Sequence, residues 1–87
     1  MPADIVMYTR QGCHLCEQAW KQLEQARRRY GFALRQVDID SEVQLVREYG
    51  ECVPVVVVNG RVRFRGLVNR VLLRRLLEGG ADEAPPV

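Results

Sequence analysis

The hydrophobic and polar positions in the first half of the chain predict a strand, a helix and a second strand. Residues 5–8 form a short apolar run with β-branched and aromatic side chains, which is typical of a buried strand. After Cys13 the apolar residues recur with a helical period, and Gly31 is the expected C-terminal stop. Residues 32–38 then indicate a second strand. The apolar stripe of the helix consists of Cys16, Ala19, Trp20, Leu23, Ala26 and Tyr30.

A short second helix is expected between that strand and Gly50. Ser41 and Gln44 have the spacing of a capping box, in which each side chain bonds to the backbone of the other residue. The order strand, helix, strand, helix favours a βαβ unit with parallel strands.

Two more strands and a last helix follow. Residues 55–58 are wholly apolar, and Asn59-Gly60 is a strong signal for a two-residue hairpin. Residues 61–65 alternate strictly, so Val62 and Phe64 are expected to face inward and the three arginines outward. The final amphipathic helix is marked by Leu72, Leu73, Leu76 and Leu77 and closed by Gly79-Gly80.

The predicted order is therefore β-α-β-α-β-β-α, an α/β fold in which helices flank a four-stranded mixed sheet. Residues 1–80 are expected to form one domain. Residues 81–87 contain two acids and two prolines, and we expect them to be a disordered C-terminal tail.

Composition narrows the class of protein further. A chain of 87 residues, 47% of them apolar, can build one small core, and three cysteines are too few for a disulfide scaffold. The net charge of +2 gives no general reason to expect nucleic-acid or membrane binding. No run approaches the roughly 20 apolar residues of a spanning helix, and the N-terminus lacks the pattern of a signal peptide. We expect a cytoplasmic monomer.

Cys13 and Cys16 form a C-x-x-C motif with several interpretations: a metal clamp, a structural disulfide, a redox centre or an inert reduced pair. A stable metal site needs about four ligands, and only Cys52 could join the pair, because His14 would point elsewhere. An iron–sulfur cluster shared between two chains stays open as an alternative. The position of the motif at a strand-to-helix turn favours the redox centre.

The helix start explains how such a pair would work. Unpaired N–H groups and the positive end of the helix dipole favour a thiolate at Cys13. Arg10, and His14 if protonated, would act in the same direction. Cys16 lies one helical turn later, so it could attack a mixed disulfide formed on Cys13.

A second landmark is Val53-Pro54, at the start of the apolar strand. Proline is found in strands mainly at their first residue or at an edge. The peptide bond could be an ordinary trans bond, or a cis bond that leaves the backbone of Val53 free to pair with an extended peptide. For the neighbouring Cys52 we favour a small buried hydrophobic side chain over a redox role.

Together these features resemble the glutaredoxin family and its glutaredoxin-like relatives within the thioredoxin fold. The matching stretches are Y-T-R-Q-G-C-H-L-C at residues 8–16, V-D-I-D at 37–40, C-V-P-V-V-V-V-N-G at 52–60, and Gly66. The resemblance implies a thioredoxin-like fold and a dithiol thiol-disulfide oxidoreductase that reduces protein or glutathione mixed disulfides. It makes Cys13 the nucleophile and Cys16 the resolving thiol, with no tightly bound cofactor and with glutathione as a candidate co-substrate.

The same resemblance implies a glutathione site. Arg10 would contact a carboxylate, the Val53 backbone would pair with the cysteinyl part, and Pro54 would be cis. His14, Gly66 and Asn69 would contact the rest of the ligand. The chain departs from the family by having Cys-His-Leu-Cys, and by having only one glycine before the last helix.

Two further expectations concern partners. Disulfide-containing proteins are the expected substrates, and glutathione or thioredoxin reductase is the expected electron donor. The competing hypotheses are an iron–sulfur or metal carrier that uses Cys13, and a non-catalytic binding module with the same fold.

Overall fold

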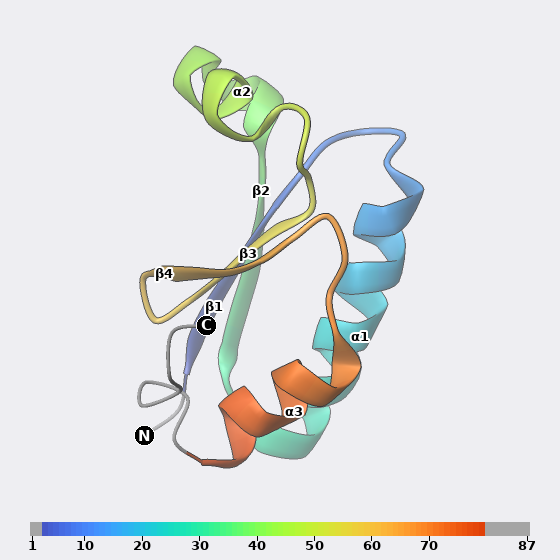
Figure 1. The fold of residues 1–87 in the computed structure, drawn as a ribbon, viewed down its shortest axis with the longest axis vertical. Helices are drawn as coiled ribbons and strands as arrows, with labels where there is room; N and C mark the ends of the chain where they lie inside the picture. The colour runs from blue at the N-terminus through green and yellow to red at the C-terminus, as the bar shows by residue number, and fades with distance from the viewer. Residues whose placement is uncertain (1–2, 80–87) are drawn as a thin grey trace.

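The centre of the molecule is a mixed four-stranded sheet (Figure 1). The computed structural model describes residues 3–79. The spatial order of the strands is β2-β1-β3-β4; β1 pairs parallel with β2 and antiparallel with β3, and β3 pairs antiparallel with β4. The strands are β1 (Asp4–Thr9), β2 (Ala33–Asp38), β3 (Val55–Val58) and β4 (Arg61–Arg65).

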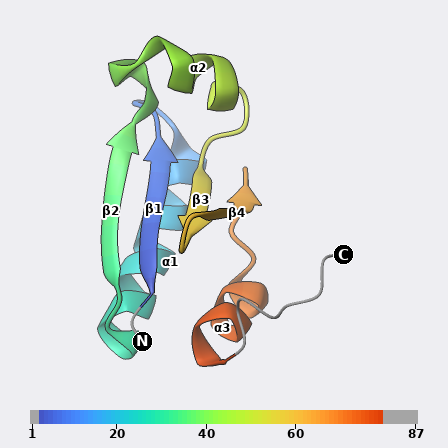
Figure 2. The same cartoon turned by 90° about the vertical axis from the view of Figure 1, so that its left-hand side faces the viewer.

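Within residues 3–79, three α-helices flank this sheet. The long helix α1 (His14–Tyr30) packs on one face, and α3 (Arg70–Glu78) lies against the second half of α1 (Figures 1 and 2). A short 3-10 turn η1 (Ile39–Ser41) leads into α2 (Val43–Tyr49), which sits at the opposite end of the sheet from α3. The predicted order β-α-β-α-β-β-α and the flanked mixed sheet are confirmed.

The core fills the space between the sheet and α1. Leu23 of α1 and Ile5 of β1 are fully buried there, and Cys16 belongs to the same cluster. Burying each large aliphatic side chain contributes about 1.5–3 kcal/mol, which fixes α1 on the sheet. Gly31 ends α1 in the left-handed conformation, with φ 70°, as predicted. The apolar stripe predicted for α1 is therefore the face that meets the sheet.

The predicted capping box is wrong. Glu42 is the N-cap of α2 and makes no side-chain capping hydrogen bond. Ser41 instead ends η1, and its hydroxyl donates to the carbonyl of Asp38 at 2.7 Å. The cause is local competition, because Asp38 accepts from the N–H of Asp40 and Ser41 donates to the carbonyl of Asp38, and these bonds close a tighter turn in place of the capping box.

The strict alternation predicted for β4 is wrong in part. Asn59 and Gly60 have φ angles of 51° and 83°, so the two-residue hairpin is confirmed. Beyond it, Val57 pairs with Val62 while Val56 pairs with Phe64, so Arg63 is an extra residue. This bulge leaves Val62 38% exposed and Arg63 half-buried, because an inserted residue shifts the side-chain alternation.

Two expectations stay outside this description. The predicted domain end at residue 80 and the predicted tail at 81–87 lie outside the described residues. Among the helices of residues 3–79, none has the length and apolar character needed to cross a membrane.

Candidate active site

The strand register brings four separate segments to one end of the sheet. Tyr8 pairs with both Val37 and Val55, and Val55 pairs with Arg65. The chain leaves β1, β2 and β4 at this end and enters β3 there (Figure 1). The four segments are the loop that precedes α1 (residues 10–13), the turn η1, Val53-Pro54, and residues 66–69.

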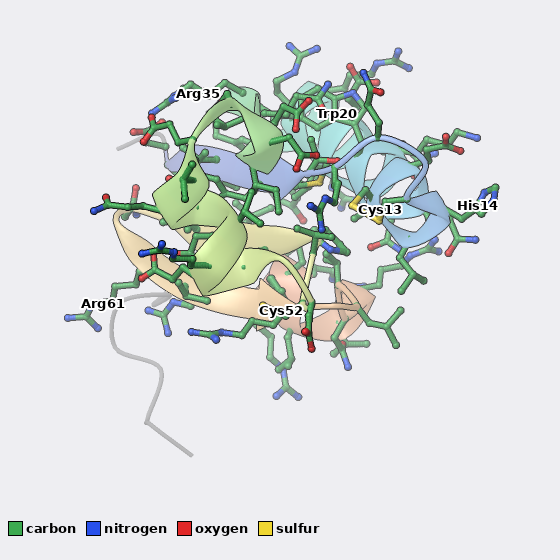
Figure 3. The ribbon with its side chains drawn as sticks, turned by 90° about the horizontal axis from the view of Figure 1, so that it is seen from above. Cys13, His14, Trp20, Arg35, Cys52 and Arg61 are labelled. Atoms are coloured by element: carbon green, nitrogen blue, oxygen red, sulfur yellow. A yellow bond between two sulfur atoms is a disulfide. The ribbon has the colours of Figure 1, made fainter. Side chains whose placement is uncertain are left out.

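Cys13 stands at the start of α1 as its N-cap residue. Its Sγ accepts a hydrogen bond from the backbone N–H of Cys16 at 3.1 Å. The two cysteines form a disulfide, with their Cα atoms 5.2 Å apart (Figure 3). Cys13 is half-buried, whereas Cys16 is only 2% exposed.

This position has a chemical consequence for the reduced protein. The first turn of a helix carries unpaired N–H groups and a positive partial charge. The N–H of Cys16 already points at Sγ of Cys13, so it stabilises negative charge on that sulfur. A thiolate is the nucleophilic form of cysteine, so this end of α1 favours an attacking sulfur.

Arg10 is held by Asp40, a residue to which the sequence assigned no role. Nη2 of Arg10 donates to Oδ1 of Asp40 at 2.8 Å and Nε donates to Oδ2 at 3.1 Å. A third bond runs from Nη1 to the carbonyl of Gly50 at 3.2 Å. These contacts raise the pKa of Arg10 and lower the pKa of Asp40, first through the hydrogen bonds and then through their opposite charges.

The pairing changes what Arg10 can do for the cysteines. Its charge is opposed by a carboxylate at bonding distance, so its field at Cys13 is weaker than an isolated arginine would produce. The signal that could have found Asp40 is its place in the sequence. It follows the strand that pairs in parallel with the strand before Arg10, and parallel strands end side by side.

His14 and Cys52 do not join the disulfide. His14 is exposed at the first turn of α1, and its side chain points away from Cys13 (Figure 3), as expected. Cys52 is a free thiol in the turn after α2, half-buried rather than buried, and apart from the disulfide (Figure 3). Within residues 3–79, no group of three or more metal-ligating side chains is gathered in one place.

The Val53-Pro54 peptide bond is cis, which was one of the two alternatives. Pro54 is buried, and its carbonyl accepts from the N–H of Gly66 at 2.9 Å. Val53 precedes the first residue of β3 that pairs with β1, which is Val55. The backbone of Val53 therefore lies just outside the hydrogen-bond ladder between β1 and β3.

Gly66 and Asn69 both have local structural roles. Gly66 has φ 84°, a conformation that favours glycine, in the turn between β4 and α3. Oδ1 of Asn69 accepts from the N–H of Leu72 at 3.0 Å and caps α3. Roles in glutathione binding stay predictions for all six residues: Arg10, His14, Val53, Pro54, Gly66 and Asn69.

The family comparison covers nearly all of the described chain. The model of the glutaredoxin-like domain (DUF836) matches residues 4–78. The search of curated proteins found no match.

Solved structures agree with that match. The X-ray structure of a structural genomics target protein from X. campestris is 35% identical over 93% of this chain and 99% of its own, with a TM-score of 0.71. A protein from Nitrosomonas europaea is 28% identical over 90% of this chain and 94% of its own, with a TM-score of 0.78. A mutant thioredoxin from Halobacterium salinarum is 21% identical over 98% of this chain and 77% of its own, with a TM-score of 0.67, which bears on the fold alone. The predicted thioredoxin-like fold is confirmed.

Proposed function

Because the chain belongs to the family of glutaredoxin-like domains, we propose that it is a small dithiol thiol-disulfide oxidoreductase. Cys13 is the attacking thiol and Cys16 the resolving thiol. The position of the Cys13 sulfur carries the proposal. This sulfur caps α1 and accepts a hydrogen bond from the N–H of Cys16, and it lies within disulfide distance of the buried sulfur of Cys16.

The reaction needs only these two sulfurs and a substrate disulfide. The thiolate of Cys13 attacks one substrate sulfur, forms a mixed disulfide and releases the other substrate sulfur as a thiolate. Cys16 then loses its proton and attacks Sγ of Cys13, which releases the second substrate thiolate. Two electrons pass from the protein to the substrate, and the protein is left with the Cys13–Cys16 disulfide.

The unequal burial of the two cysteines supports the order of these steps. A half-buried Cys13 can be reached by a substrate disulfide, whereas Cys16, 2% exposed, can react only with a sulfur already attached to Cys13. The helix dipole acts on Cys13 at the N-cap more directly than on a residue one turn inside the helix.

The substrate is proposed to lie along the backbone of Val53. That residue precedes the paired part of β3, so its N–H and C=O are suited to hydrogen-bond an extended chain beside the disulfide. Proteins with disulfides are the proposed substrates, and glutathione or thioredoxin reductase is the proposed donor. We also propose that the protein acts as a cytoplasmic monomer without a tightly bound cofactor.

Cysteine variants test the proposal. The reduced protein should reduce an insulin disulfide, and Cys13→Ser should abolish this activity. Cys16→Ser should keep the first step and accumulate a mixed disulfide that mass spectrometry detects. Cys52→Ser is the matched control and should retain activity.

Three results would contradict the proposal. Equal activity of Cys13→Ser and the parent protein would remove Cys13 from the reaction. A brown purified protein with iron–sulfur absorption and no disulfide reduction would favour a cluster carrier, and a colourless inactive one would favour a binding module.

A further inference from the structure

The structure bears on the class of thiol that the proposed active site accepts. Arg10 comes three residues before Cys13, in the loop that carries the attacking sulfur. A small anionic thiol attached to Cys13 would place its carboxylates close to this loop. A free guanidinium there would attract it, because a guanidinium fork binds a carboxylate through two parallel hydrogen bonds.

That fork is already occupied within the protein. Two of its nitrogens donate to the two carboxylate oxygens of Asp40 at 2.8 and 3.1 Å, and a third donates to Gly50. Asp40 thus occupies the pair of N–H groups on Arg10 that could otherwise bind the carboxylate of a small thiol. Three of the five N–H groups of Arg10 are in use, so a ligand carboxylate must displace Asp40 or bind through the two that remain.

The exposed apolar side chains at the same end suit a different partner. Leu15 lies between the two cysteines of the motif and is 42% exposed. Leu67 follows Gly66, whose N–H bonds to Pro54, and is 69% exposed. Apolar side chains at the end of the sheet that carries the attacking sulfur are complementary to the side chains of a polypeptide, and they offer no hydrogen bond to a carboxylate.

We propose that Asp40 is a specificity-determining residue. By occupying Arg10, it weakens the binding of small anionic thiols of the glutathione class. The redox centre then exchanges electrons with polypeptide dithiols and disulfides in preference to small anionic thiols. This inference rests on the proposed function, because it concerns the partner of the same two cysteines.

Asp40→Asn tests this by a gain of activity. In the measured reaction, one glutathione thiolate attacks Cys13 and frees Cys16. A second then attacks the bound glutathione, which releases Cys13 and yields glutathione disulfide. Water screens an exposed ion pair, so freeing Arg10 should raise the rate constant only modestly, about 1.5- to 5-fold. The rate with dithiothreitol, which has no carboxylate, should rise less than the rate with glutathione, and added salt should remove the difference.

Three controls identify the cause of a gain. Glu42→Gln removes a nearby carboxylate that makes no side-chain cap hydrogen bond, and it should leave the glutathione rate unchanged. The double variant Asp40→Asn, Arg10→Gln should lose the gain. Glutathione ethyl ester, which lacks the glycyl carboxylate, should show a smaller gain than glutathione. Asp40→Ala serves as a second variant, and circular dichroism shows that each protein is folded.

Different results would reject the specificity role of Asp40 and the proposed oxidoreductase function. An unchanged glutathione rate in both Asp40 variants overturns the specificity role of Asp40. A gain that persists in the double variant without Arg10 overturns it too. In that case another cation, such as Arg65, would bind the glutathione carboxylate. If neither glutathione, dithiothreitol nor reduced thioredoxin reduces the Cys13–Cys16 disulfide, the proposed oxidoreductase function is wrong instead.

Discussion

The hydrogen bond from the N–H of Cys16 to Sγ of Cys13 predicts how reactive Cys13 is in the reduced protein. Cys16→Ala frees the Cys13 thiol and keeps the backbone N–H that points at it over 3.1 Å. Adding Cys52→Ser leaves Cys13 as the only thiol. In this variant we expect the helix terminus to lower the pKa of Cys13 below the value of about 8.5 for an ordinary thiol.

The size of the effect follows from that contact. A hydrogen bond to a charged group stabilises it by about 1.5–3 kcal/mol, and about 1.4 kcal/mol changes an equilibrium tenfold. The ratio of thiolate to thiol on Cys13 should therefore rise about 10- to 150-fold. An ordinary thiol is about 3% thiolate at pH 7, so the folded protein should hold about a quarter to four-fifths of Cys13 as thiolate.

Alkylation with iodoacetamide across pH 4 to 10 measures this directly, because only the thiolate reacts. The same variant unfolded in guanidinium chloride is the matched reference and should titrate as an ordinary thiol. A folded protein whose alkylation rate rises at the same pH as the unfolded one would refute the reasoning. In that case the capping geometry would place Sγ at the helix terminus without activating it.

Three further predictions concern the parts that hold the site in place. Leu23→Ala opens a cavity under α1 where the side chain is fully buried, and it should lower the free energy of unfolding in urea by about 2–5 kcal/mol; a loss below about 1 kcal/mol would mean that α1 is not anchored there. Asn69→Ala removes the cap of α3 and should cost about 1 kcal/mol in the same assay, whereas an unchanged midpoint would show that the cap contributes nothing. Arg10 lowers the pKa of Asp40, so the stability from this pair should be present above about pH 4 and lost as the pH falls further. Urea midpoints of the parent and Asp40→Asn should therefore differ at pH 6 and converge at pH 2.5; a constant difference would contradict the pairing.

Patterns that depend on neighbouring residues were readable from the sequence. The apolar stripe of α1, its stop at Gly31, the Asn59-Gly60 hairpin and the place of Cys13 at the helix start all agree with the structure. Each depends on local backbone preferences or on the period of one element. The prediction failed where two local preferences competed, as at Ser41, where the turn after β2 formed in place of a capping box.

Features that depend on the pairing of distant segments needed the tertiary structure. The bulge at Arg63 depends on how β4 meets β3, and the alternation of the strand alone gives no sign of it. The pairing of Arg10 with Asp40 depends on the parallel register of β1 and β2, which puts the ends of these strands side by side.

The sequence by itself determined the type of fold and the two sulfurs of the candidate site, because helix periodicity and the C-x-x-C spacing are both local. The tertiary structure decided what surrounds those sulfurs. Cys16 is buried because the stripe of α1 meets the sheet, and Arg10 is engaged because a neighbouring strand ends in an acidic turn. Burial and charge pairing are properties of contacts between distant segments, and such contacts exist only once the sheet has formed.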